Sequence, residues 1–249
     1  AALITPAIFQ ARISAQNAAI RAEIDLLHMG IMNYKNRFGS YPPCSSNCAE
    51  DGDLNARNHV ARLFPRCDTR CDKLPNGSDR PGFPQSPTVQ DQFHVILNSN
   101  GIDDDGDGDV DENDENFYNE ISPLDSLLFW LGGYSSNPAN PLQSGGVREK
   151  LYDEDASRVD PRSKAYHPSG KPNSPFIYID ASNYGQTFVH SDVAGGFEIP
   201  GGPYQAEVDS SGAFHNPGKF QILNAGLDEQ WGTDDDLSNF WKGTRGDQE

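Results

Sequence analysis

The residues with the clearest capacity for chemistry form an acidic loop between Asp103 and Asp114. Aspartates recur there at alternate positions, and the sixth position is Gly108, which is the spacing of EF-hand calcium loops. A hard cation prefers oxygen ligands, and crowded carboxylates repel one another without one, so the loop predicts a calcium site. The expected ligands are Asp103, Asp105, Asp107, Asp109 through its carbonyl, Asp111 and Asp114.

Two features separate this loop from a calcium sensor. Its twelfth position is Asp114 rather than a bidentate glutamate, and no clear helix precedes it. It therefore resembles dockerin-type loops, in which calcium acts as a structural brace. The alternative is a solvated acidic turn without a metal.

A second acidic stretch lies near the C-terminus, in residues 224–237. Carbonyl oxygens such as those of Leu227 or Trp231 are further possible ligands. From its composition alone, a calcium site and a solvated turn are equally open. The side-chain candidates are Asp228, Asp234, Asp235 and Asp236.

The four cysteines form two pairs with three residues between the partners, Cys44 with Cys48 and Cys67 with Cys71. Four cysteines allow three disulfide connectivities. In an exported protein, disulfides are expected, and a nested arrangement would join Cys44 to Cys71 and Cys48 to Cys67. The alternative is a zinc site made by all four, although their spacing is not that of a zinc knuckle.

The sequence carries no recognisable catalytic motif. Its six histidines are scattered, and it has no His-Glu-x-x-His helix, Gly-x-Ser-x-Gly elbow or nucleotide-binding glycine loop. We expect no catalytic residues and no enzymatic activity, which leaves a calcium-stabilised extracellular hydrolase as the weakest alternative. The aromatic residues indicate a core or subunit interface, or else a sugar-binding platform: Trp130, Tyr134, Tyr178, Tyr184, Trp231, Phe240 and Trp241.

A long N-terminal helix is the strongest structural prediction. Its apolar residues recur at steps of three or four, and Gly39 stands where a C-terminal cap belongs, so the helix should end near Phe38. About 38 helical residues give a rod of about 57 Å, which is longer than a domain of this size needs. Part of the rod should project, and close packing against other copies is expected through Ala7, Ile8, Ala11, Ile13, Ala15 and Ile20.

The remaining elements are shorter. Strand patterns follow the helical ones, so we expect an α+β fold in which the helix packs on a small antiparallel sheet with long loops. Helices are predicted over residues 54–64 and 124–131, strands over 93–97, 176–179 and 220–223, and loop over most of 138–175.

The charge of the chain limits its partners. The sequence has 37 acidic and 19 basic residues, a formal net charge of −18, which repels nucleic acid and anionic membrane surfaces and favours cations. No apolar run is long enough to span a bilayer. Residues 1–9 read like the second half of an apolar segment, so we expect that the start of this segment is missing.

Two separated stretches resemble the type IV pilin and type II secretion pseudopilin superfamily, most closely the major pseudopilin. Residues 34–42 are similar to the end of the pilin helix and its Gly-x-Tyr-Pro turn. Residues 224–237 are similar to the pseudopilin calcium loop, with Gly-x-Asp followed by Gly-Thr-Asp-Asp-Asp. The family's processed, methylated N-terminus is absent, and the four-cysteine segment is unusual for the major pseudopilin.

This resemblance implies a calcium-stabilised structural subunit of an extracellular filament, exported across the inner membrane. Residues 1–38 would form the pilin-like helix, and 39–249 the globular head, with a large insertion at 44–120. The implied partners are further copies of the chain and the inner-membrane assembly machinery, with the membrane itself contacted only through the missing apolar segment. The alternative from another class is a secreted, monomeric, calcium-binding module for carbohydrate or adhesion.

Overall fold

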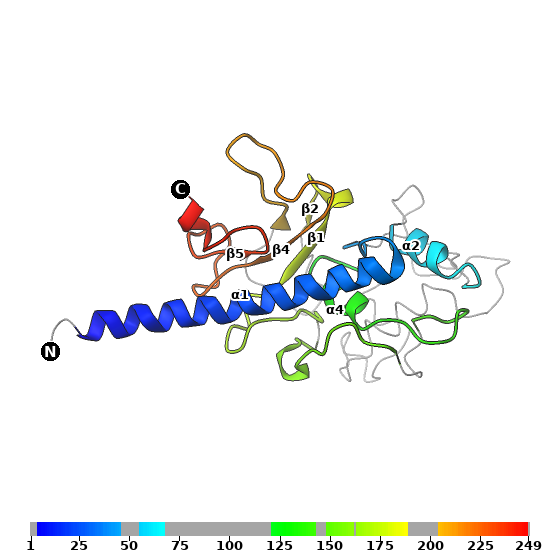
Figure 1. Cartoon of the computed structure of the whole chain (residues 1–249), viewed down its shortest axis with the longest axis horizontal. Helices are drawn as coiled ribbons and strands as arrows, with labels where there is room; N and C mark the ends of the chain where they lie inside the picture. Colours follow the sequence, from blue (N-terminus) through cyan, green and yellow to red (C-terminus); the bar gives the residue numbers. More distant parts are fainter. Residues whose placement is uncertain are drawn as a thin grey trace, which may run out of the picture.

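The computed structural model describes residues 4–45, 55–67, 121–142, 148–161, 163–188 and 204–248. A single 35-residue helix, α1 (Ile4–Phe38), runs past a small antiparallel sheet, and its N-terminal half extends beyond the rest of the molecule (Figure 1). The predicted α+β fold, with a long N-terminal helix packed on a small antiparallel sheet, is therefore confirmed.

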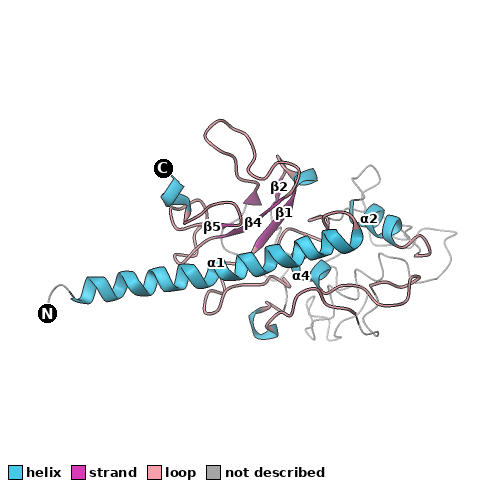
Figure 2. Cartoon of the chain, viewed as in Figure 1, coloured by secondary structure: helices cyan, strands magenta, loops and turns pink. Residues whose placement is uncertain are grey.

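The main sheet has three strands in the order β1-β4-β5, all antiparallel to their neighbours (Figure 2). In β1 (Ile177–Asp180) and β4 (Phe220–Asn224) every residue is buried, so these strands lie in the interior. The short strand β5 (Leu237–Ser238) pairs with the end of β4. A separate two-stranded sheet joins β2 (Thr187–Phe188) to β3 (Tyr204–Gln205).

Shorter helices complete the described structure. Two of them match the sequence-based helices closely, because their apolar residues recur at helical spacing. The others are single turns of 3₁₀-helix in connecting segments. Their bounds are α2 (Asn55–Leu63), α4 (Ser126–Leu131), η1 (Ala156–Arg158), η2 (Ala181–Asn183) and η3 (Arg245–Gln248).

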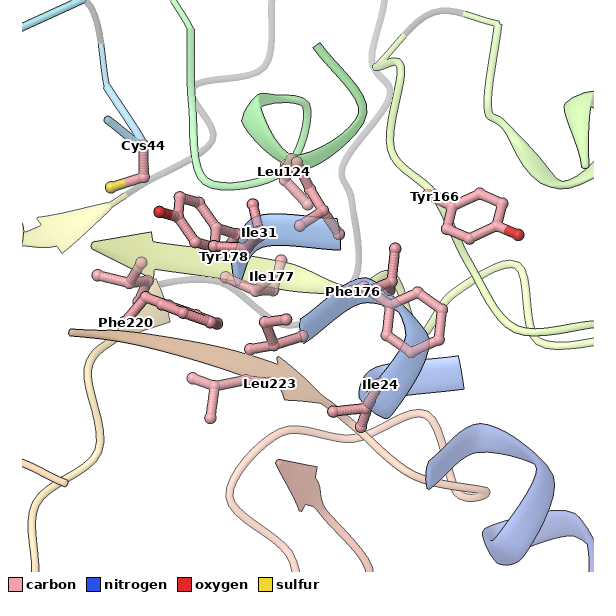
Figure 3. Packing of buried hydrophobic residues seen from close by; sticks show 14 of the residues in the cluster. Ile24, Ile31, Cys44, Leu124, Tyr166, Phe176, Ile177, Tyr178, Phe220 and Leu223 are labelled. Carbon is pink, nitrogen blue, oxygen red and sulfur yellow. The ribbon is translucent and has the colours of Figure 1, made fainter. Parts of the chain in front are cut away.

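The core lies where the apolar stripe of α1 meets the sheet. Ile24 and Ile31 of α1 belong to one buried cluster with Tyr178 of β1 and Phe220 of β4 (Figure 3). A methyl group at Gly30 would lie 3.2 Å from a methyl carbon of Leu131, so this glycine allows α4 to approach α1 closely. The core thus fixes α1 against both the sheet and α4.

The N-terminal half of α1 has no such cover. From Ala7 to Ala19 every side chain is exposed or half-exposed, and Ile8 and Phe9 keep 64% and 63% of their surfaces accessible. At its other end the helix stops as predicted. Gly39 adopts a left-handed conformation, with φ of 85°, and its amide donates to the carbonyl of Lys35 at 2.7 Å.

The C-terminal segment is tied to α1 where the helix enters the body. The guanidinium of Arg21 donates to three consecutive carbonyls, those of Trp241 at 2.5 Å, Gly243 at 2.7 Å and Lys242 between them. Charge-assisted bonds of this kind are stronger than neutral ones. Arg21 therefore joins the helix to a segment 220 residues away in the chain.

A buried polar network joins the end of α1 to α2. The hydroxyl of Tyr34 contacts both Nε2 of His59, at 2.6 Å, and the hydroxyl of Tyr134. Arg62 donates to Nδ1 of the same histidine at 3.2 Å. Because a guanidinium only donates hydrogen bonds, Nδ1 must accept, so Nε2 carries the proton and His59 is neutral.

This geometry predicts a pH-dependent stability. Burial lowers the pKa of His59 to about 4, whereas an exposed histidine titrates near 6.5. Below pH 6.5 His59 therefore binds a proton in the unfolded chain but stays neutral in the folded chain. The free energy of unfolding falls with pH until the pKa of the folded state is reached. We expect His59 to remove about 2 kcal/mol of unfolding free energy between pH 7 and pH 5.

The measurement is urea unfolding at both pH values for the wild type and for His59→Gln. The other titrating groups are shared by the two proteins, so the difference between their pH dependences isolates His59. An equal pH dependence in both proteins would contradict the assignment of a neutral, buried histidine.

Candidate functional site

Only part of the predicted site chemistry falls within the described residues. The acidic loop from Asp103 to Asp114 lies outside them, as do Cys48, Cys71 and the predicted strand at residues 93–97. The calcium prediction for that loop therefore stays a prediction. The second acidic stretch, between β4 and β5, lies wholly within the described residues.

The pairing of β4 with β5 closes this second loop at its base. Asn224, the last residue of β4, lies opposite Leu237, the first of β5, so residues 225–236 form the connection. Gly226 has φ of 66°, and a Cβ there would lie 2.3 Å from the carbonyl oxygen of Asp235. Glycine is therefore required where the two arms of the loop touch.

The carboxylate of Asp235 closes the loop from within. Its Oδ2 accepts the amides of Leu227 at 2.7 Å and Asp228 at 3.0 Å, and its Oδ1 accepts the hydroxyl of Thr233 at 2.7 Å. Two successive amides aimed at one oxygen make a small anion-binding site in the backbone. Asp235 therefore serves as the anion that this turn binds.

Asp236 is the most buried acidic residue of the loop, with 4% of its surface exposed. Its Oδ2 accepts the amide of Gly232 at 2.8 Å and lies 3.5 Å from the guanidinium of Arg245, while Oδ1 is buried without a hydrogen-bond partner. Burial raises the pKa of Asp236 to about 6, against the opposing effect of the Gly232 and Arg245 contacts.

The other two predicted ligands lie at the surface. Asp228 is exposed and accepts the amide of Gln230 at 2.8 Å, and Asp234 is exposed and contributes its carbonyl to the amide of Gly246. Across the described ranges, no three histidine, cysteine, aspartate or glutamate side chains gather as a metal site would require. The carboxylates of Asp235 and Asp236 accept hydrogen bonds from their own chain, and the calcium prediction for this loop stays a prediction.

Sequence reasoning missed the cations of this site. Lys171 donates to the carbonyl of Leu227 and lies 3.3 Å from the carboxylate of Glu229. Arg245 reaches the loop from the opposite side, through Asp236. The one signal in the sequence was that basic residues are scarce. This does not indicate which acidic residue each basic residue contacts.

The two described cysteines are both buried. The amide of Cys44 donates to Oδ2 of Asp180 at 2.8 Å, and burial raises the pKa of the Cys44 thiol well above that of an exposed cysteine. Cys67 is buried in a cluster that includes Ala56 and Val60 of α2. Since their proposed partners lie outside the described residues, the nested disulfides and the zinc alternative both stay predictions.

The predicted filament-interface residues separate into two groups. Ala7, Ile8, Ala11 and Ala15 are exposed, and Ile13 is half-buried. Ile20 does not belong with them, because it is only 4% exposed and packs in the core of its own chain. The structure adds exposed apolar residues further along α1, namely Leu26 and Met29.

The aromatic residues considered for a sugar-binding platform divide between the interior of the molecule and its margins. Trp130, Tyr134 and Tyr178 are buried, whereas Tyr184, Trp231, Phe240 and Trp241 are partly exposed. Trp231 packs edge-on against Tyr204 at a centroid distance of 5.4 Å. These rings fill the interior and its margins, as aromatic residues of a core do.

Comparisons with protein-family models, with curated proteins and with solved structures find no match. Within the described part of the chain, no helix combines the length and the apolar character needed to cross a membrane.

Proposed function

We propose that this protein is a structural subunit of an extracellular helical filament, similar to a type IV pilus or a type II secretion pseudopilus. One observation carries the proposal, the exposed N-terminal half of α1. From Ala7 to Ala19 it is a helix of about 20 Å whose side chains are exposed or half-exposed, so their own chain does not give them full cover. A filament supplies that cover from neighbouring copies.

The exposed half of α1 lacks a packed face of the kind that stabilises most protein helices. Helices of this length are marginal in water and draw most of their stability from a packed face. Burying Ile8 and Phe9, both more than 60% exposed, contributes about 1.5–3 kcal/mol each. The alanines between them and the body allow a second helix to approach closely. Self-association through this half of α1 would therefore bury apolar surface that stays exposed in the isolated subunit, which stabilises the assembly.

The shape of the molecule suits such an assembly. The helix projects from one end of the sheet-containing body, so copies can place their helices together with the bodies outside (Figure 1). A net charge of −18 makes the bodies repel one another, which favours a role for cations at the surface of an assembly. Calcium at the 103–114 loop, the inner-membrane assembly machinery as partner and export to the cell surface are parts of the same proposal.

The test is electron microscopy of the subunit with its native N-terminus, in millimolar calcium and after chelation. We expect regular filaments from the wild type, and none from Ile8→Asp or Ala15→Asp, because a charge on a packed helix face is left without a partner. Both side chains are exposed, so the unfolding free energy of the soluble subunit should change by less than about 0.5 kcal/mol.

Matched controls decide between assembly and folding. Gln10→Asp adds the same charge to the exposed half at a polar position and should preserve filaments. Ile24→Asp places the charge in the core and should unfold the subunit itself. Dispersed monomers from the wild type in both conditions would reject the filament, and glycan binding by those monomers would favour the secreted binding module.

A further inference from the structure

The acidic loop between β4 and β5 contains a cation of its own. The ammonium of Lys171 donates a hydrogen bond to the carbonyl of Leu227, which was one of the possible calcium ligands in the sequence. The same ammonium lies 3.3 Å from Oε1 of Glu229, and both side chains are largely buried. A positive charge thus lies against a carbonyl oxygen and a carboxylate oxygen of the loop.

Lys171 is held in place by its own backbone. Its amide donates to the carbonyl of Pro168 at 3.1 Å, and its carbonyl accepts the amide of Ser174 at 3.2 Å. Two residues further on, the amide of Asn173 donates to Oε2 of Glu229 at 3.1 Å. Glu229 therefore joins the lysine side chain to the backbone of the same turn, so the ammonium has little freedom to leave.

A second cation acts at the other end of the loop. Arg245 lies 3.1 Å from Oε1 of Glu207 and 3.5 Å from Oδ2 of Asp236. Its amide also donates to the carbonyl of Asp236 at 2.8 Å. The buried carboxylate of Asp236 is thus compensated by a guanidinium that its own chain supplies.

We propose that Lys171 and Arg245 hold this loop closed in place of the calcium ion expected from the family resemblance. Each is tethered to the fold, so its occupancy does not depend on the concentration of a free cation. The carboxylates of Asp235 and Asp236 accept backbone amides of the same loop, as a loop without a metal permits. The loop then keeps its conformation when calcium is removed. This inference does not depend on the filament proposal.

The experiment is amide hydrogen exchange, read by mass spectrometry on peptides covering residues 225–236 and, as a reference, β1. In saturating calcium, Lys171→Met should raise exchange in the loop on the order of tenfold, because a charge-assisted bond is lost, while β1 stays protected. Lys219→Met removes the same charge from an exposed position and should leave the loop unchanged.

The second arm uses the wild type with calcium alone as the probe. Chelation should leave the exchange of the loop, taken relative to β1, within about twofold of its value in calcium. The proposal is overturned if Lys171→Met leaves the loop protected in calcium. It is also overturned if chelation opens the wild-type loop tenfold more than β1, since calcium would then be the ion that closes it.

Discussion

Replacing Trp130 with alanine should lower the free energy of unfolding by about 3–5 kcal/mol. The indole is fully buried, and its Nε1 donates to the carbonyl of Pro43 at 2.7 Å. Its ring also packs against Tyr34 of α1, His59 of α2 and Tyr134. One side chain therefore holds together three segments that are distant in the sequence, and its loss leaves a cavity among them.

The measurement is urea unfolding of the wild type, Trp130→Ala and Trp130→Phe. Phenylalanine keeps most of the ring but cannot donate to Pro43, so it should lose about 1–3 kcal/mol from the unsatisfied carbonyl and the smaller volume. A loss below about 1 kcal/mol for the alanine variant would show that this cluster contributes little to the stability of the fold.

Replacing Arg158 with methionine should cost about 3 kcal/mol, because it leaves a largely buried carboxylate without its cation. The guanidinium NH1 donates to Oε2 of Glu23 at 2.8 Å, and NH2 contacts the other oxygen of the same carboxylate. The hydroxyls of Tyr166, at 2.8 Å, and Tyr152, at 3.3 Å, also donate to Glu23. This cluster fastens α1 to the segment that contains η1.

The loss should grow with pH. Burial raises the pKa of Glu23 to about 7, although direct contact with Arg158 favours the ionised form. Without the arginine, a buried ionised carboxylate is unfavourable, and protonation of Glu23 removes this cost. The variant should therefore lose less stability at pH 6 than at pH 8. Urea unfolding at the two pH values measures this difference.

A double-mutant cycle supplies the control. Glu23→Gln removes the charge from the other side, and the double variant has no unpaired ion left in the interior. We expect the double variant to lose clearly less stability than the sum of the single variants. Strictly additive losses would contradict a direct ion pair between these two residues.

Much of the fold follows from local patterns in the sequence. The end of α1 was predicted near Phe38 because an apolar stripe and a cap glycine coincide there, and the structure confirms both. Compact apolar runs likewise located the two strands that cross the core. The predicted and observed bounds differ by one to two residues, at 176–179 against Ile177–Asp180, 220–223 against Phe220–Asn224, 54–64 against Asn55–Leu63 and 124–131 against Ser126–Leu131.

The short strands escaped prediction because two residues carry no periodicity. β2, β3 and β5 are each two residues long, and β5 exists only because the loop returns it to β4. Ile20 shows a different limit. Its place in the stripe with Ile24 and Leu27 predicts the core, but the sequence does not say where along the stripe the body of the molecule begins.

The candidate site was the hardest part to predict, because its partners are far apart in the chain. The pattern of aspartates marked residues 224–237 as an acidic stretch after a strand, and the structure adds that Gly226 stands where the two arms of the loop touch. The pattern could not show that Lys171, 56 residues before Leu227, supplies a cation. Nor could it show that the carboxylate of Asp235 would accept hydrogen bonds from the amides of Leu227 and Asp228.

The attachment of Arg21 gives α1 a mechanical property. Ile20 is the first buried residue after the exposed half, and the carbonyls of residues 241–243 hold the guanidinium of the next residue, Arg21, against a pull along the helix. The three bonds share this load at the same time, as in shear, whereas bonds arranged in sequence would open one by one. Tension on the exposed half is therefore passed to the C-terminal segment that follows β5.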